Sequence, residues 1–534
     1  MVAQSSDKGK IKRIDNNPQV ELFDPQWVEE EEQKEEAEQE EQAGPQRLPQ
    51  FLNPDPRGIR IGRKTLKEHL QSCGEEGILQ QRDFLQGLDW SSFKSRYGAG
   101  GRRPYHPAAM TSLVLFGISQ GQCSLRELEK LAQMDARGWW LTGGLRPDHS
   151  AIGHFLNLHA KDLTEDFFVQ MTRQVLKHTG GKGEQLAGDG TLVQAAASRY
   201  RRLKQEAAEQ QAEEARQAAR QEPENAALQE KARRAQKVAE TAQERAEARE
   251  KNRAKGVVKV SPTEPEAVIQ PLKKGPVVPA YRPSVLANPN RVVVAQKLHG
   301  SSENEVFGDL LEQARRVTGG VKRVILDAGY FDSKVLQVAL NDPELEDLLC
   351  VEAEDEQGNP RRKSRGHALG KEKFEYEEEQ DRYRCPAGEY LWPGRKGRDR
   401  GKEYRVYRGK ACKKCALRQQ CTQQSRREIR RWEGEELKEA MREVMSQPGA
   451  QRMYRQRKSW VEPVFSEMKG VQRLTRFLRF GLAGVSLEFA LHAMAHNLRR
   501  LTALSPLFLS ILARLLGYQR TFCRFIPHLS SRIP

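Results

Sequence analysis

The fold is decided by one short stretch, Val324-Ile325-Leu326-Asp327-Ala328-Gly329-Tyr330. Its first three residues are large and apolar, as is typical of a strand buried inside a sheet. Gly329 lies in the turn that follows, and Asp332 is placed to cap the next helix. The stretch therefore predicts a strand, a turn and a helix, with the carboxylate of Asp327 at the end of the strand.

More strand signals lie upstream of this stretch. Residues 285–287 and 291–294 are two β-rich runs on either side of Asn288-Pro289-Asn290, which predicts a hairpin. We interpret residues 181–200, 257–349 and 446–500 as pieces of one α/β domain with a mixed sheet. Two insertions, 201–256 and 350–445, split that domain.

The N-terminal part of the chain has helix signals instead. Pro107 can begin a helix that ends near Gly121, Ser124 and Glu127 form a capping-box pair, and Asp148 can cap another helix. Short helices with tight connections fit a helix-turn-helix DNA reader and a small helical bundle equally well. We predict that residues 56–180 form an all-helical DNA-binding region.

Composition limits the class of protein. A chain of 534 residues is too long for one ordinary core, and its formal net charge of +16 favours a polyanionic partner, although a solvated basic surface is the alternative. Residues 1–55 are rich in Glu, Gln and Pro, which predicts a flexible acidic arm. The tail, 501–534, has no uninterrupted apolar span, so we expect a soluble cytoplasmic protein near the nucleoid, with no membrane partner.

The two insertions differ in character. Residues 201–256 are mostly Ala, Glu, Gln, Arg and Lys with Pro223 as an interruption, which predicts a charged helical hairpin or a partly disordered arm. The second insertion carries a basic run at 426–431 that could follow a DNA backbone, and four cysteines, Cys385, Cys412, Cys415 and Cys421. The close pair in Cys-Lys-Lys-Cys suits a structural Zn²⁺. Four unpaired thiols are the alternative, because the wider gaps are not a standard finger spacing.

Two further acids accompany Asp327: Asp189 in Gly188-Asp189-Gly190-Thr191, and Glu462 in Val461-Glu462-Pro463. Each alone could be a turn residue, a strand terminator or a surface partner. Together they fit phosphodiester chemistry, in which two metal ions about 4 Å apart activate the attacking oxygen and stabilise the leaving one. Carboxylates suit Mg²⁺ or Mn²⁺, which leave coordination sites for water and phosphate.

A late signature carries a family resemblance: Tyr454, then Arg457 and Lys458, then Glu462, Lys469 and Arg476-Phe477. With the Asp-Gly-Thr and Asp-Ala-Gly-Tyr segments, it resembles the DDE transposases of bacterial insertion sequences over most of residues 56–500. Either Arg457 or Lys458 fits the basic position of the signature, because Tyr454 lies one residue farther upstream than the commonest spacing.

The resemblance implies a ribonuclease-H-like core in which Asp189, Asp327 and Glu462 hold Mg²⁺ or Mn²⁺. It also implies that DNA contacts Tyr454, Arg457, Lys458, Lys469 and Arg476. Because Pro463 disfavours helical geometry in the residue before it, we expect a helix that begins at Pro463 and presents Glu462 from its first turn. Lys469, seven residues later, then lies on nearly the same face.

The expected function is transposition. The enzyme would bind the terminal inverted repeats of an insertion sequence, nick them and join the freed 3′-hydroxyl to target DNA, as a homodimer or a higher multimer. A metal-dependent nuclease without strand transfer and an inactive DNA-binding regulator are the alternatives. His492 and His496, four residues apart, are expected to pack structurally rather than to bind metal.

Overall fold

The computed structural model describes residues 49–53, 55–98, 100, 102–251, 256–272, 275–352, 369–399 and 401–504. Most of the predicted acidic arm and nearly all of the predicted tail lie outside these residues. Met1–Phe51 and Ser95–Pro104 form one compact unit, whose described part includes an edge-to-face ring contact between Phe51 and Tyr97. All features below belong to the other unit, Leu52–Lys94 and Tyr105–Pro534.

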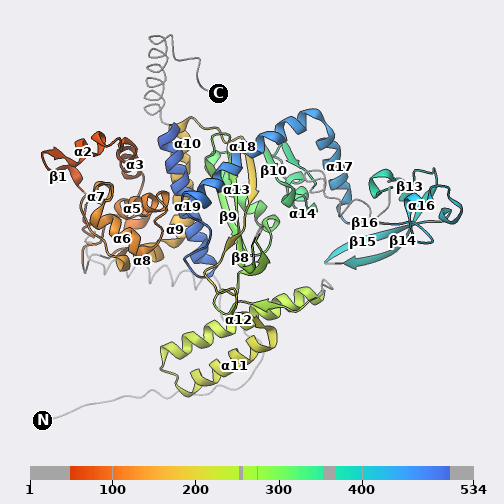
Figure 1. Ribbon diagram of the computed structural model, residues 1–534, viewed down its shortest axis with the longest axis horizontal. Helices are drawn as coiled ribbons and strands as arrows, with labels where there is room; N and C mark the ends of the chain where they lie inside the picture. The colour runs from red at the N-terminus through yellow and green to blue at the C-terminus, as the bar shows by residue number, and fades with distance from the viewer. Residues whose placement is uncertain are drawn as a thin grey trace, which may run out of the picture. The chain divides into compact units, whose positions relative to one another are not determined.

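A mixed sheet forms the centre of the chain (Figure 1). Strand β3 (Gln185–Gly190) pairs in parallel with β10 (Arg323–Leu326), which pairs in parallel with β11 (Asp347–Cys350). On its other side β3 pairs antiparallel with β8 (Val277–Ala287), and β8 forms a hairpin with β9 (Val293–His299). The predicted buried strand and the predicted hairpin are both confirmed. Short strands β4 (Val193–Gln194) and β7 (Val268–Pro271) extend the sheet along the first half of β8.

Helices dominate the N-terminal part, as predicted. Ser124 and Glu127 form the predicted capping box at α6, and the Asp148 side chain caps α8 by accepting from the N–H of Ala151. The elements here are η1 (Pro56–Gly58), β1 (Arg60–Ile61), β2 (Lys64–Thr65), α2 (Leu66–Ser72), α3 (Glu76–Gln86), α4 (Ser91–Lys94), α5 (Pro107–Ser119), α6 (Leu125–Met134), α7 (Ala136–Thr142), α8 (His149–Leu158), α9 (Ala160–Thr164) and α10 (Asp166–Thr179).

Other helices connect and cover the strands. Between β9 and β10 lie η2 (Glu303–Val306) and α13 (Phe307–Thr318), and after β10 come η3 (Ala328–Tyr330) and α14 (Ser333–Leu340), which Asp332 caps as predicted. The C-terminal helices are α17 (Glu435–Ser446), α18 (Pro448–Gly470) and α19 (Gly481–Leu504). Among the helices that the structure describes, none combines the length and the apolar character that a membrane span requires.

The expected helix start at Pro463 is wrong. Pro463 lies inside α18, which begins 15 residues earlier at Pro448, so Glu462 occupies the middle of a long helix. A proline there leaves one carbonyl in the preceding turn without its helical partner. The helix nevertheless continues because Val461, Val464 and Phe465 are buried on its sheet-facing side. Packing of this apolar stripe outweighs the local preference of proline.

The first insertion is a helical hairpin. α11 (Gln205–Gln221) and α12 (Ala226–Lys251) pack against each other through small side chains, among them Ala208, Ala212 and Ala242. The break between them includes Pro223, as the sequence predicted. The short strands β5 (Leu203–Lys204) and β6 (Lys259–Val260) pair where the hairpin leaves and rejoins the chain.

The second insertion forms a separate antiparallel sheet. Its strands follow one another in chain order: β12 (Glu375–Glu377), β13 (Arg382–Arg384), β14 (Tyr390–Asp399), β15 (Lys402–Gly409) and β16 (Glu428–Trp432). Short helical turns η5 (Lys371–Lys373), η6 (Cys412–Lys414) and α16 (Arg418–Cys421) accompany it. Its own core is small, with Phe374, Tyr383, Leu391, Tyr407 and Ile429 as the buried members.

Candidate active site

Asp189 and Asp327 lie beside each other at the centre of the sheet. The parallel register of β3 and β10 pairs Gly188 with Leu326; Asp189 follows Gly188 on β3, and Asp327 directly follows the last residue of β10. Neighbouring strands are about 4.8 Å apart, so the two carboxylates start from adjacent backbone positions. The sheet therefore brings together two acids that are far apart in the chain.

Glu462 reaches the same region from α18. This helix packs on β3, β10 and β11, and the Glu462 side chain is exposed. Its negative charge acts on Asp189. Burial raises the pKa of Asp189 to about 6; Arg457 and the Gly190 N–H oppose that rise, and the charges of Glu303 and Glu462 add to it. The site thus concentrates negative charge around a half-buried carboxylate.

Arg457 and Lys458 occupy opposite environments on α18. The Arg457 side chain is buried, and its Nη1 lies 3.7 Å from Asp189 Oδ1 and 3.5 Å from the Gly188 carbonyl oxygen. Lys458 is exposed. Tyr454 lies one turn before Arg457, with the guanidinium 5.8 Å from its ring centroid. Of the two basic candidates, Arg457 is the one that the fold brings to the acids.

Lys469 lies next to the segment that follows Asp189. Its ammonium donates hydrogen bonds to the Thr191 hydroxyl and, at 3.2 Å, to the Leu192 carbonyl oxygen. Arg476 lies beside β4, where its Nη2 is 3.5 Å from the Ala197 carbonyl oxygen, and its side chain is exposed. Both cations therefore border the strand segment that leads away from Asp189.

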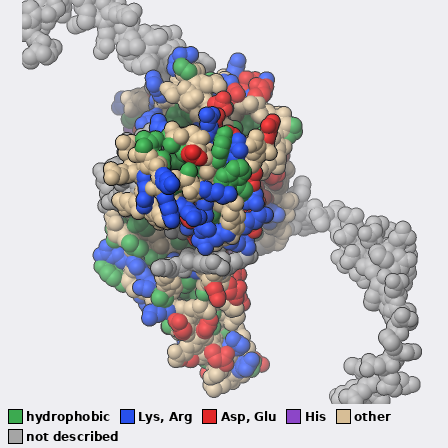
Figure 2. Space-filling model, turned by 90° about the vertical axis from the view of Figure 1, so that its right-hand side faces the viewer, with side chains coloured by type: hydrophobic (Ala, Val, Ile, Leu, Met, Phe, Trp, Pro, Cys, Tyr) green, Lys and Arg blue, Asp and Glu red, His purple; other side chains and the backbone are tan. Residues whose placement is uncertain are grey.

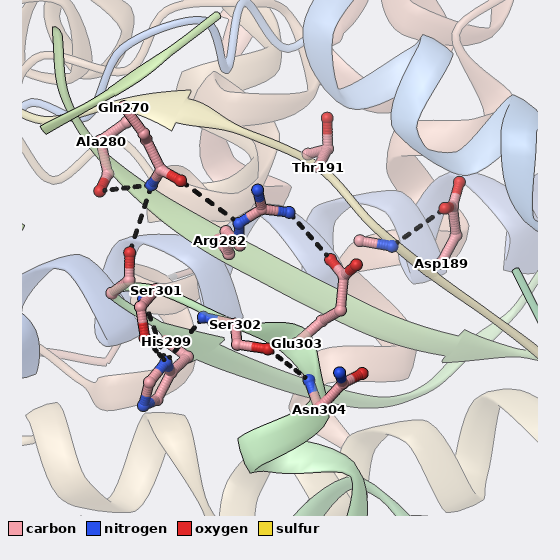
Figure 3. Close-up of polar contacts among 12 residues, drawn as sticks. Asp189, Thr191, Gln270, Ala280, Arg282, His299, Ser301, Ser302, Glu303 and Asn304 are labelled. Carbon is pink, nitrogen blue, oxygen red and sulfur yellow. Dashed lines mark hydrogen bonds and ion pairs between the residues drawn. The ribbon is translucent and has the colours of Figure 1, made fainter. Parts of the chain in front are cut away.

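Glu303 is an acid that the sequence analysis did not select. It begins η2 and is 8% exposed, and Arg282 on β8 donates from Nη1 to its Oε2 at 3.3 Å. Figure 3 shows the Glu303 carboxylate paired with Arg282, with Asp189 on the other side of the carboxylate. The signal that could have found it is weak, because Glu303 stands in Ser-Ser-Glu-Asn-Glu without a strand end or a motif around it.

The acids fit a hard divalent cation. In the described part of the chain, no three His, Cys, Asp or Glu side chains are arranged to hold a metal ion as they stand. Mg²⁺ does not require three, because it is usually bound through one or two carboxylates, with water and phosphate as the other ligands. Asp189 near the end of β3 and Asp327 just after β10 supply two carboxylates.

His492 and His496 pack structurally, as expected. His492 is buried on α19 and contacts Gln472 at 2.8 Å. The Nε2 of His496 lies 2.7 Å from the Arg291 carbonyl oxygen, and its Nδ1 lies 3.2 Å from Glu467. Each histidine thus has a partner in the surrounding structure.

The four clustered cysteines lie around one cavity beside the five-stranded sheet. None forms a disulfide, and the Cys412 sulfur accepts the backbone N–H of Arg427 at 3.4 Å. Burial raises the pKa of the Cys421 thiol, Arg427 opposes this, and the other three thiols add to the rise. Folding therefore gathers thiols that are widely spaced in the chain.

Basic side chains gather on the side of the molecule that carries this sheet (Figure 2). Arg395, Lys396 and Arg398 on β14 and Arg430 on β16 are exposed. Arg431 is held instead by Glu439, 2.7 Å away, so the basic run at 426–431 is only partly free to meet a ligand.

Two family models match the chain. Residues 384–502 match a transposase DDE domain, and residues 79–158 match a transposase domain (DUF772). Both matches confirm the resemblance to insertion-sequence DDE transposases. The first match spans α18 with Glu462 and Lys469 and also the four cysteines, and the second spans α5 to α8 and most of α3. No curated protein and no solved structure matches the chain.

Proposed function

We propose that the chain is a DDE transposase with a ribonuclease-H-like core, which binds the ends of an insertion sequence and catalyses strand cleavage and strand transfer. The observation that carries this proposal is the register of β3 and β10, which places Asp189 next to Asp327 under the helix that bears Glu462. The two transposase family matches support it independently.

In this proposal Asp189, Asp327 and Glu462 hold Mg²⁺ or Mn²⁺. When bound, the ions would activate the attacking oxygen and neutralise charge that develops on the phosphate. Arg457 holds the strand end in place through Asp189 and the Gly188 carbonyl oxygen. Lys469 would meet a DNA phosphate beside the acids, since its ammonium is anchored at Thr191.

Exposed cations and the N-terminal helices would bind the rest of the DNA. Tyr454, Lys458 and Arg476 are proposed to contact DNA near the site, and the helices of residues 56–180 to read the terminal inverted repeats. Because two element ends and a target duplex must meet, we propose that the working form is a homodimer or a higher multimer in the cytoplasm, at the nucleoid.

We also propose that Cys385, Cys412, Cys415 and Cys421 hold a structural Zn²⁺. All four line one cavity. The hydrophobic core of their sheet is small, and a bound metal ion is one way in which a fold with a small core is stabilised. As placed, no three of these thiols converge on a point, so binding requires their side chains to turn inward.

The test is a reaction of the purified chain with DNA that carries the element's own flanking ends and Mg²⁺ or Mn²⁺. The wild type should give cleaved and joined products. Asp327→Asn should lose both by at least roughly 100-fold, because loss of even an outer partner of a metal ligand typically costs 10–100-fold. Asp309→Asn, an exposed aspartate on α13, is the matched control and should retain both products.

Other outcomes identify the alternatives. Cleaved DNA without joined product indicates a nuclease. DNA binding without cleavage by the wild type indicates a regulator, and cleavage that survives in Asp327→Asn contradicts the proposed site.

A further inference from the structure

Glu303 lies beside the two backbone segments that carry Asp189 and Asp327. It is the first residue of η2, directly after the loop that leaves β9, and its neighbour Ser302 caps that turn. The side chain is nearly enclosed, with 8% of it exposed. A carboxylate costs several kcal/mol to bury without compensation, so its surroundings require an explanation.

Two glycines make room for this carboxylate. Gly190 follows Asp189, and Gly329 comes two residues after Asp327. A Cβ added at Gly190 would stand 2.5 Å from Glu303 Oε2, and one added at Gly329 would stand closer still to Oε1. Neither glycine has a positive φ, so both are needed for space rather than for backbone conformation. The Glu303 carboxylate therefore packs directly on the backbone beside both aspartates.

A fixed cation orients Glu303. Arg282 donates from Nη1 to Oε2 at 3.3 Å, and its Nε donates to Gln270 Oε1 at 3.3 Å (Figure 3). The arginine is thus held by contacts at both its Nε and its Nη1, and it fixes one oxygen of the Glu303 carboxylate, which packs beside Gly190 and Gly329. Side-chain order of this kind is what a metal centre needs in its ligands.

Acidic side chains are concentrated around the site. Asp189, Asp327, Glu303 and Glu462 contribute carboxylates here; Arg282 pairs with Glu303, and Arg457 pairs with Asp189. The charge of Glu303 acts on Asp189 and on the buried Tyr330 hydroxyl. A divalent cation would offset part of this negative charge.

We propose that Glu303 is a fourth carboxylate of the metal centre and binds a divalent cation held between Asp189 and Asp327. As placed, no three of these carboxylates converge on one point, so binding requires the acidic side chains to turn toward the cation. This inference rests on the proposed function of those two residues. It assigns to η2 a role in metal binding, with Gly190 and Gly329 providing the space for the ligand.

The experiment measures Mn²⁺ binding to the full chain without DNA, by calorimetry and by the electron paramagnetic resonance signal of free Mn²⁺. Glu303→Gln should weaken Mn²⁺ binding by about 10-fold or more. Glu305→Gln is the matched control in the same turn; Glu305 is exposed and pairs with Lys334 at 3.1 Å, so this variant should bind Mn²⁺ as the wild type does.

A second readout separates metal binding from folding. The rise in melting temperature between EDTA and Mn²⁺ reports binding within each variant, whatever its stability without metal. This rise should shrink in Glu303→Gln and persist in Glu305→Gln. Gly329→Ala provides a further variant that keeps all four acids but displaces the Glu303 carboxylate, and it should shrink the rise as well.

The failures are distinguishable. If Glu303→Gln and Gly329→Ala bind Mn²⁺ like the wild type while Asp189→Asn does not, Glu303 is not a ligand and the proposed function stands. If Asp189→Asn and Asp327→Asn also bind like the wild type, the metal centre lies elsewhere and both proposals are wrong.

Discussion

Arg457 and Lys458 show how burial separates two chemically similar neighbours. Adjacent residues on a helix point about 100° apart, so only one of them can face the sheet. Arg457 faces it and reaches Asp189, whereas Lys458 is exposed. A guanidinium also suits the site better, because its several donors serve the carboxylate and the Gly188 carbonyl oxygen together.

The buried His492 side chain should make the free energy of unfolding depend on pH. Burial lowers the pKa of His492 to about 3, far below its ordinary value of 6.5. Between these values the unfolded chain binds a proton that the folded chain does not, so stability present above pH 6.5 is lost as the pH falls. His492→Gln should remove this dependence and flatten the slope of unfolding free energy by up to about 1.4 kcal/mol per pH unit.

Urea denaturation at pH 5, 6 and 7, followed by circular dichroism, measures that slope. His154→Gln changes an exposed histidine on α8 and is the control, with a slope like that of the wild type. Equal slopes for His492→Gln and the wild type would show that His492 is protonated in the folded chain.

At the scale of elements, packing against neighbours determines the structure of both α18 and the α11–α12 hairpin. α18 continues through Pro463 because its buried stripe packs on the sheet. The hairpin is highly charged, yet its two helices pair because alanines on both form a narrow shared core. In each case packing between elements decides the structure, as is usual where local propensity is only a weak guide.

We predict that the four cysteines beside the five-stranded sheet bind zinc. The full chain, purified in a reducing buffer, should contain about one Zn²⁺, and the double substitution of Cys412 and Cys415 by serine should remove it. Because the core of this sheet is small, the same variant should also lower its thermal stability. Elemental analysis measures the zinc, and replacement by Co²⁺ should give the absorption bands of cobalt–thiolate bonds.

The matched control is the double substitution of Cys73 and Cys123 by serine, since neither residue lines the cavity. That variant should keep its zinc. A wild-type chain that is zinc-free, or whose melting temperature is unchanged by a chelator, would contradict the zinc site.

At the scale of the whole molecule, the N-terminal helices and the central sheet share one hydrophobic core. One cluster of buried side chains includes Leu66 in the N-terminal helices, the strands of the central sheet and Leu501 on α19, whereas the two insertions have cores of their own. α19 packs on α5, α9 and α10 and also on β9, so it joins the helical region to the sheet. The predicted boundary near residue 180 is therefore crossed by continuous packing, and the division into domains stays a prediction.

Asn497 on α19 links the same elements through hydrogen bonds. Its side chain is fully buried. The Oδ1 atom accepts a hydrogen bond from the Val293 N–H at 2.8 Å. The Nδ2 atom donates to the Val293 carbonyl oxygen at 2.8 Å and to the Thr172 hydroxyl on α10 at 3.2 Å. Asn497→Leu would leave these buried groups without partners and should lower the free energy of unfolding by about 2–4 kcal/mol.

Urea denaturation measures this loss. Asn157→Leu, at an exposed position on α8, is the comparison and should cost less. A loss below about 1 kcal/mol for Asn497→Leu would show that the tie between α19, β9 and α10 is not important for stability.

The sequence by itself determined the local features of this protein. The strand before Asp327, the β8–β9 hairpin and the capping box at Ser124 were all predicted, because their signals lie within a few neighbouring residues. The helical hairpin was one of two structures predicted for residues 201–256, the other being a partly disordered arm. The candidate acids were likewise selected from short motifs, and the family matches agree with the resemblance that those motifs carry.

Only the tertiary structure decided which residues meet. The pairing of β3 with β10, the choice of Arg457 over Lys458, the continuation of α18 through Pro463 and the approach of Glu303 to Gly190 and Gly329 all depend on segments far apart in the chain. Strand register and helix facing are set by the burial of a shared core, and no short stretch of sequence contains that information.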